Sequence, residues 1–211
     1  MYTLYYSPGA ASMCVHLTLI ETNAPHQLKL VDLAAGEQRD PAYLKLNPNG
    51  VVPTLLIDGN PFYEAAAALM TIAERHPEAK LAPPVDSLAR AAWNQWIVHF
   101  ANTLQPAFRL WFYPQDIVSD AAAQVVVKTA AQSKIEAAWD RLELHLSANG
   151  PYLLGDTLSA ADLMLIMLMR WSRNMPRPVT QWPALAAYAN LMKSRPGWKR
   201  LYKVEDLTEW V

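Results

Sequence analysis

The chain has 211 residues, of which 52% are hydrophobic and 18% are charged, so it can build one large domain or two small ones around a real core. Its formal net charge is −1 and it has no long Lys/Arg cluster, so nothing in its composition favours a nucleic acid or an anionic membrane as partner. Cys14 is the only cysteine, which excludes an internal disulfide and a cysteine-rich metal site and favours a reducing compartment.

Two features of the sequence bear on where the protein is located: its N-terminal stretch and its most apolar run. The start, MYTLYYSPGAAS, lacks the basic beginning and apolar core of a signal peptide. The most apolar run, residues 158–169, contains Asp162 and is too short to cross a bilayer. We therefore expect a cytoplasmic protein.

Residues 1–78 alternate between strand and helix patterns, and their order β-α-β-α-β-β-α implies a small mixed sheet with helices on its faces. An Asp-Gly-Asn turn at 58–60 joins the last two strands. The expected elements are a strand at 2–6, a helix at 12–22, a strand at 26–33, a short helix and a turn within 37–50, two strands within 51–63, and an alanine-rich helix from Glu64.

Three prolines within 75–87 predict a linker, which we place at 79–86, between a first domain at 1–78 and an all-helical domain at 87–211. In the helical domain, Ser159 and Asp162 have the spacing of a capping box, a folding signal to which we assign no ligand. The expected helices are 87–112 with a kink at Pro106, 120–149, 159–171, 183–195 and 196–203.

The stretch PFYEAAAALM (61–70) places one carboxylate, Glu64, at the head of an alanine run that predicts a helix. The first turn of that helix exposes unpaired N–H groups and a partial positive charge. Glu64 and these amides together fit a small molecule that carries both an ammonium and a carboxylate. The alternative is an ordinary first-turn Glu, which any helix favours.

The turn in YYSPGAASMCVH (5–16) leads from a strand into a helix N-terminus, an arrangement that binds anions. Ser12 lies at this helix start, where its hydroxyl either caps the helix or faces a ligand. Because side chains alternate along a strand, only one of Tyr5 and Tyr6 can point toward the turn. Cys14 is expected to be buried rather than reactive.

Val52-Pro53 precedes a strand, where a proline must lie at an edge or an end. A cis bond there would leave the N–H and C=O of Val52 unpaired. These two groups would then be free to bind an extended peptide as an added strand.

Taken in order, these features resemble the cytosolic glutathione transferase family over essentially the whole chain. The matching motifs are YSPGA.S after the first strand, NPNGVVP before the third, YEAAAAL at the alanine-rich helix, the proline-rich linker and LSAADL in the helical half. The proline-rich first turn and LAPPVDS are similar to the bacterial beta-like members. The resemblance implies an α+β, thioredoxin-like first domain and an all-α second domain. It also implies a homodimer held by the linker region, the following helix and residues 64–73.

The same resemblance implies a detoxifying enzyme that conjugates the glutathione thiolate to hydrophobic electrophiles, with glutathione as co-substrate and with no cofactor or metal. Val52, before a cis Pro53, would pair with the cysteinyl backbone of glutathione. Glu64 would face the γ-glutamyl ammonium, and the Ala65 amide would hold the carboxylate beside it. Ser12 would activate the thiol, with Tyr6 as the alternative. Further implied positions are Ala11 and Gln38 for glutathione, and His99, Gln105, Phe108 and Trp111 for the electrophile pocket, although aromatics at helical spacing also fit an ordinary core.

Three positions depart from the family pattern. The Ser that usually follows the Glu is Ala65, and the loss of one hydrogen bond to a charged group weakens binding by about tenfold to a hundredfold. The first-turn Cys of beta-like members is Ala11, so no mixed disulfide can form there, which disfavours a glutathione-dependent reductase or lyase. Their His on the fourth helix is Gln105. These departures keep open a non-catalytic binding or carrier protein with a weakened glutathione site.

Overall fold

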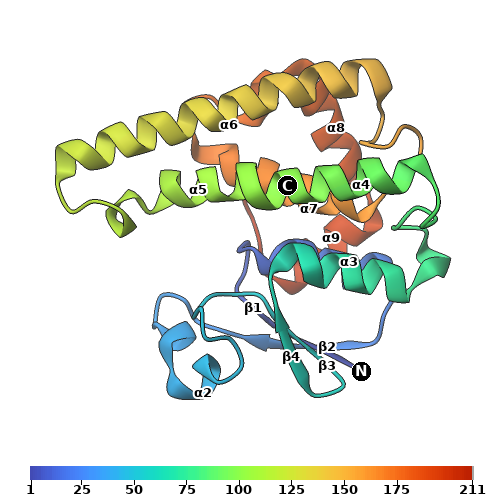
Figure 1. Ribbon diagram of the computed structural model, residues 1–211, viewed down its shortest axis with the longest axis horizontal. Helices are drawn as coiled ribbons and strands as arrows, with labels where there is room; N and C mark the ends of the chain where they lie inside the picture. Colours follow the sequence, from blue (N-terminus) through green and yellow to red (C-terminus); the bar gives the residue numbers. More distant parts are fainter. Residues whose placement is uncertain (211) are drawn as a thin grey trace. The chain divides into compact units, whose positions relative to one another are not determined.

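The computed structural model describes residues 1–210, and Val211, the last residue of the predicted helical domain, lies outside the described residues. The described chain divides into two compact units (Figure 1): a sheet unit, residues 1–83 with 192–210, and a helical unit, residues 84–191. The sequence had attached 192–211 to the helical domain. This segment groups with the sheet because side chains of the first helix bind it, through the pairs His16–Glu205 and Glu21–Arg195.

The sheet unit holds a four-stranded mixed sheet in the order β2-β1-β3-β4. Strand β1 pairs in parallel with β2 and antiparallel with β3, which pairs antiparallel with β4. The predicted order of strands and helices is therefore confirmed. The elements of this unit are β1 (Tyr2–Tyr6), α1 (Ser12–Glu21), β2 (His26–Leu30), η1 (Glu37–Arg39), α2 (Pro41–Leu44), β3 (Thr54–Ile57), β4 (Asn60–Tyr63), α3 (Ala65–Arg75), η2 (Pro77–Ala79) and α9 (Pro196–Val204).

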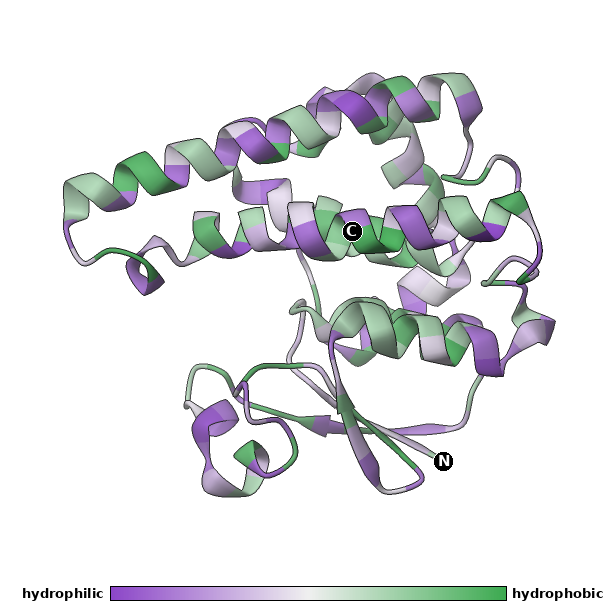
Figure 2. Cartoon of the chain, in the orientation of Figure 1, coloured by the Kyte–Doolittle hydropathy of each residue, from purple (hydrophilic) through white to green (hydrophobic). Residues whose placement is uncertain are grey.

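Helix α1 forms the centre of the sheet unit, and its residues 12–20 are all buried. It packs against β1, α3 and α9, and Figure 1 shows α3 and α9 on the same side of the sheet. Figure 2 shows mainly hydrophobic residues along α3, as expected for a helix that covers a sheet. The turn between β3 and β4 has positive φ at both Asp58 (50°) and Gly59 (87°), the conformation that a two-residue hairpin turn requires.

The helical unit begins with one long helix that changes its winding part-way. Pro106, where the sequence predicts a kink, occupies the first turn of α5, directly after a π-helix. The elements are α4 (Leu88–His99), η3 (the π-helix Phe100–Leu104), α5 (Gln105–Phe112), η4 (Pro114–Asp116), α6 (Ala121–Asn149), α7 (Ala160–Trp171), η5 (Ser172–Asn174), η6 (Val179–Gln181) and α8 (Pro183–Ser194), whose last three residues belong to the sheet unit.

Helix α7 supplies the core of the helical unit, and its residues 160–170 are all buried. The predicted capping box is present, since Ser159 and Asp162 bond reciprocally at its N-terminus. Helix α6 differs from α7 in composition, because hydrophilic and hydrophobic residues are mixed along it in Figure 2. Within residues 1–210, none of the helices has the length and apolar character needed to cross a membrane.

Candidate active site

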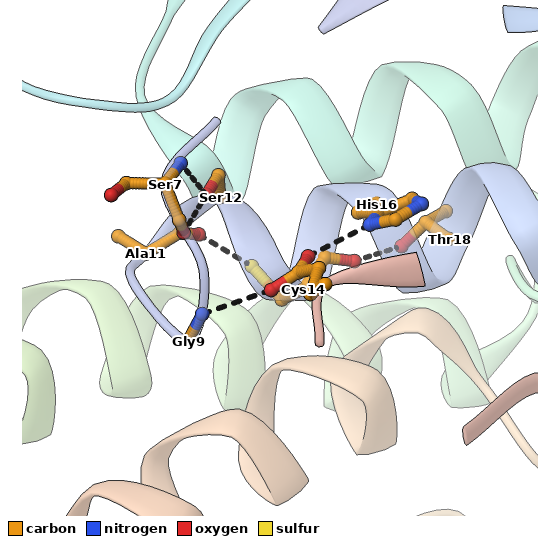
Figure 3. A network of polar contacts seen from close by, with 8 residues as sticks. Ser7, Gly9, Ala11, Ser12, Cys14, His16 and Thr18 are labelled. Atoms are coloured by element: carbon orange, nitrogen blue, oxygen red, sulfur yellow. Dashed lines mark hydrogen bonds and ion pairs between the residues drawn. The ribbon is translucent and has the colours of Figure 1, made fainter. Parts of the chain in front are cut away.

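The loop after β1 is closed by the side chain of Ser12, the first residue of α1. Its hydroxyl donates to the Ser7 carbonyl oxygen at 3.1 Å and accepts the Ser7 N–H at 3.2 Å (Figure 3). The Ser12 side chain is fully buried. Its hydroxyl therefore holds the loop in shape, and its proton already has an acceptor.

A carboxylate from the C-terminal segment holds the same loop. Glu205 accepts the Gly9 N–H at 2.9 Å with one oxygen and lies 2.7 Å from His16 Nδ1 with the other. Figure 3 shows Gly9 and His16 making these contacts from the loop and from α1. Both partners of the His16–Glu205 pair are buried. The sequence had assigned no role to either residue, and the signal that could have drawn attention to this pair is a histidine inside an otherwise apolar helix.

Tyr6 at the end of β1 and Cys14 in the first turn of α1 differ in their burial. Tyr6 is half-buried, its ring lies 6.0 Å from that of His16, and its hydroxyl has no hydrogen-bond partner among residues 1–210. Burial, and then the charge of Glu205, raise the pKa of Tyr6, so this phenol stays protonated at neutral pH and can act as a donor. Cys14 is fully buried, and burial raises the pKa of its thiol to about 12, as expected of an inert cysteine.

Val52 has the free backbone groups that the sequence predicted. The Val52–Pro53 bond is cis, and within the described chain neither the N–H nor the C=O of Val52 has a hydrogen-bond partner. In the sheet, the pairing of β3 with β4 begins at Thr54 and Tyr63, so Val52 lies two residues before the first paired residue of β3.

Glu64 is the residue between β4 and α3. It is the N-cap residue of α3, with φ 72° and ψ 108°, and its exposed side chain accepts no hydrogen bond from the helix. The first three amides of α3, those of Ala65, Ala66 and Ala67, find no acceptor within residues 1–210, as helix geometry requires unless a ligand or a cap is present. An exposed carboxylate thus precedes a row of unpaired donors.

These groups lie next to one row of paired residues, at the ends of three strands. Tyr5, Thr54 and Tyr63 form a row of paired residues across β1, β3 and β4. The first-turn loop follows this row on β1, Val52-Pro53 precedes it on β3, and Glu64 follows it on β4. The strand ends at this row therefore present two unpaired backbone groups, two sets of unpaired helix amides and one exposed carboxylate.

Comparison with known proteins decides the family. Residues 10–75 match the family described as "Glutathione S-transferase, N-terminal domain", and residues 120–203 match "Glutathione S-transferase, C-terminal domain". A relative from Xanthomonas campestris pv. campestris, "Glutathione S-transferase GST-4.5", is 31% identical over 189 residues, covering 90% of this chain and 91% of its own. The chain belongs to the glutathione transferase family.

Solved structures of this family superpose on nearly the whole chain. A glutathione transferase homologue from Sulfitobacter, with bound glutathione, is 28% identical with a TM-score of 0.89, covering 97% of this chain and 98% of its own. The beta-class glutathione transferase of Sphingomonas chungbukensis is 31% identical with a TM-score of 0.85, covering 98% and 100%. The likeness to bacterial beta-class transferases expected from the sequence is thereby confirmed.

The family resemblance also implied that Ala11 and Gln38 contact glutathione. Ala11 is the N-cap residue of α1, and the N–H groups of Ala11 and Ser12 have no acceptor among the described residues. Gln38 lies in η1, and its Oε1 is buried without a hydrogen-bond partner in the described chain. Their contact with glutathione stays a prediction.

The four electrophile-pocket candidates lie in the helical unit and divide into two pairs. Phe108 is fully buried and Trp111 nearly so, and both contribute to the core of that unit. His99 and Gln105 keep part of their surface exposed, on either side of the π-helix. Burial, and then the charge of Arg141, lower the pKa of His99, so it is neutral at physiological pH. The pocket itself stays a prediction.

Proposed function

We propose that this glutathione transferase binds glutathione at the strand ends formed by the first-turn loop, Val52 and the start of α3. It then conjugates the glutathione thiolate to a hydrophobic electrophile. The observation that carries the proposal is the pair of unpaired backbone groups on Val52, two residues before the first paired residue of β3. A tripeptide with an extended cysteinyl backbone can complete both hydrogen bonds as an added strand.

The γ-glutamyl end of glutathione carries an ammonium and a carboxylate, and the start of α3 offers a partner for each. Glu64 pairs with the ammonium, while the amides of Ala65 and Ala66 hold the carboxylate at the positive end of the helix. Because Ala65 has no hydroxyl, the amides hold this carboxylate without a side-chain donor, and we expect weaker glutathione binding than a Ser at this position would give.

The thiol of glutathione lies in this proposal at the start of α1. The amides of Ala11 and Ser12 and the hydroxyl of Tyr6 are the donors that stabilise the thiolate, while Ser12 keeps the loop closed with its own hydroxyl. Lowering a thiol pKa by two units takes about 2.7 kcal/mol, which one phenol and a helix N-terminus can supply. The thiol proton leaves to solvent, the thiolate forms a C–S bond to the electrophilic carbon, and the leaving group departs with its electron pair.

The test is conjugation of glutathione to chlorodinitrobenzene by the wild type and by Glu64→Gln, with Glu74→Gln on the same helix as the matched control. We expect turnover by the wild type, a glutathione KM raised about tenfold or more in Glu64→Gln, and an unchanged KM in the control. No turnover by a wild type that still binds glutathione would support the non-catalytic carrier instead.

A pH profile separates the two candidate thiol-activating hydroxyls. In Tyr6→Phe the inflection of kcat/KM should move up by about one unit or more, because the thiolate loses a donor. In Ser12→Ala the inflection should stay in place while the midpoint of thermal unfolding falls. The reverse pattern would assign activation to Ser12.

We further propose a cytoplasmic homodimer with a role in detoxifying electrophiles. The family resemblance and the composition support this proposal, and the contact between subunits would use α3, the linker and α4. Light scattering at micromolar concentration should give twice the mass of one chain, and a monomer would contradict it.

A further inference from the structure

The carbonyl of Val51, one residue before the proposed glutathione-binding backbone, accepts two side-chain hydrogen bonds. The Tyr43 hydroxyl and the Asn47 Nδ2 both lie 2.8 Å from the Val51 oxygen. Tyr43 and Asn47 are buried at 6% and 0% exposure. Since a carbonyl oxygen has two lone pairs, these two donors satisfy it fully.

The first of these donors is tied to the sheet. The Tyr43 hydroxyl also lies 2.8 Å from Thr54 Oγ1 in the first residue of β3. A phenol has one proton, so when Tyr43 donates it to Val51, Thr54 must donate to Tyr43. The Val51 carbonyl is thereby connected through α2 to a fully buried residue of the central sheet.

The second donor is fixed by its own turn. Asn47 Oδ1 accepts the Asn49 N–H at 3.1 Å, and the Asn47 carbonyl accepts the Gly50 N–H at 3.0 Å. Gly50 has φ +60°, and a Cβ there would lie 3.1 Å from the backbone carbonyl oxygen of Gln38, so the turn favours glycine. With Oδ1 held by the turn, the amide of Asn47 can present only Nδ2 to Val51.

The two hydrogen bonds to the Val51 oxygen also fix the orientation of the Val52 N–H, which belongs to the same peptide group. The bond between Val51 and Val52 is trans, and in a planar trans peptide the C=O and N–H point to opposite sides. Two buried donors hold the Val51 oxygen inward, so the Val52 N–H points the other way, where it has no partner in the described chain.

We infer that Tyr43 and Asn47 are positioning residues that aim the Val52 N–H at the cysteinyl carbonyl of glutathione by holding the opposite end of the same peptide group. The inference rests on the proposed function, since it gives a role to the backbone through which glutathione is proposed to bind. Neither side chain contacts the ligand in this arrangement. Both act on affinity for glutathione and leave the chemical step unchanged.

Tyr43→Phe tests this with little change in packing, and Tyr2→Phe is its matched control. Tyr2 is equally buried, its hydroxyl lies 3.2 Å from His76 Nε2, and it pairs with Ile57 at the other end of the sheet. Calorimetry should give a glutathione Kd about tenfold higher for Tyr43→Phe and a wild-type Kd for Tyr2→Phe. At saturating glutathione, kcat should stay within about twofold of the wild type.

A second variant keeps the test open if Tyr43→Phe does not fold. Asn47→Asp keeps the acceptor for Asn49 but replaces the donor with an oxygen that repels the Val51 carbonyl, so the Kd should rise as well. In the wild type, glutathione should also slow hydrogen exchange of the Val52 amide, and it should do so less in either variant.

The outcomes separate the two claims. If the wild type binds glutathione and both variants bind it equally well, the positioning role is overturned while the proposed function stands. If the wild type does not bind glutathione, the proposed function is overturned and the positioning role falls with it. A raised Kd in Tyr2→Phe equal to that in Tyr43→Phe also overturns the inference, because general loosening of the sheet then explains both.

Discussion

Glu64 has a backbone conformation, φ 72° and ψ 108°, that residues other than glycine rarely adopt. Such a conformation costs about 1–3 kcal/mol and persists where the surrounding structure imposes it. Glu64→Gly should relieve this cost, whereas Glu64→Ala should keep it, since alanine still carries a Cβ. We expect Glu64→Gly to unfold about 2–12 °C above Glu64→Ala in calorimetry.

Comparison of the two Glu64 variants also separates stability from function. Both lack the carboxylate, so both should lose about tenfold or more in glutathione affinity, whatever their thermal midpoints. Glycine would then be favoured for stability and glutamate for binding at the same position. Equal midpoints for the two variants would show that the conformation carries no cost.

Cys14 provides a prediction that depends on burial alone. With a pKa of about 12, only about one thiol in ten thousand is ionised at pH 8, and the sulfur is fully buried. Ellman's reagent should therefore react with far less than one equivalent of thiol in the folded protein, and with one equivalent in guanidinium chloride. Because the chain has a single cysteine, the signal needs no assignment. Rapid reaction in the native state would contradict the burial.

At the scale of single residues, the sequence predicted unpaired backbone groups better than it predicted hydrogen bonds made by side chains. The unpaired Val52 and the helix start after Glu64 follow from Pro53 and the alanine run, which are local features. The burial of the Ser12 hydroxyl and the two donors on Val51 did not follow. They depend on how residues four to eight positions apart fold back on one another, and spacing along the chain does not specify that.

At the scale of elements, the start of α7 combines four hydrogen bonds on one buried carboxylate. Asp162 accepts the N–H groups of Leu153 and Ser159 and the hydroxyls of Ser159 and Tyr188, at 2.8–3.1 Å. Burial raises its pKa, and these hydrogen bonds oppose the rise. Asp162→Ala leaves buried donors without acceptors, and we expect it to cost about 3–5 kcal/mol and to lower the thermal midpoint by about 10 °C.

Asp120 is the matched control for this prediction because it caps α6 in an exposed position. Its carboxylate accepts the Ala123 N–H at 2.8 Å, and water can replace it. Asp120→Ala should cost about 1 kcal/mol, the usual value for an N-cap, and lower the midpoint by about 2–4 °C. Similar losses in the two variants would mean that burial adds nothing to the capping box.

Elements with a strong local pattern were predicted well, and those set by packing were not. The β-α-β-α-β-β-α order, the α7 capping box and the end of α6 at Asn149 each follow from residues within a few positions. The π-helix Phe100–Leu104 does not, because the sequence reads as one continuous amphipathic helix up to Pro106. Pro106 predicted a kink near this position, and nothing in the sequence predicted a π-helix.

At the scale of the whole molecule, the C-terminal segment belongs to the unit at the opposite end of the sequence. Helical periodicity alone attaches 192–211 to the preceding helices, because periodicity carries no information on which partner a helix packs against. The contacts that decide its place, His16–Glu205 and Gly9–Glu205, join residues 189 and 196 positions apart. This segment therefore stabilises the loop at the start of α1 from a distance that no local pattern reveals.

Removing this link should loosen the sheet unit without affecting the helical unit. Glu205→Ala leaves His16 buried without its partner and Gly9 without its acceptor, a loss of about 3 kcal/mol. Hydrogen exchange followed by mass spectrometry should show residues 7–21 and 195–206 exchanging about tenfold faster or more. Peptides from α7 should exchange as in the wild type.

The chain offers a matched control for this link, a second His–Glu pair on the surface of the same unit. His76 Nδ1 lies 3.1 Å from the Glu78 carboxylate, which is 68% exposed, so Glu78→Ala should leave exchange unchanged throughout. In Glu205→Gln the amide oxygen can still accept from Gly9, so its effect should fall between those of the other two variants. The loop is also proposed to hold the thiolate, and glutathione affinity should therefore decrease in the same order as the protection of residues 7–21. Faster exchange in α7 together with α1 would show instead that the two units unfold as one, and that Glu205 stabilises the whole molecule rather than the loop.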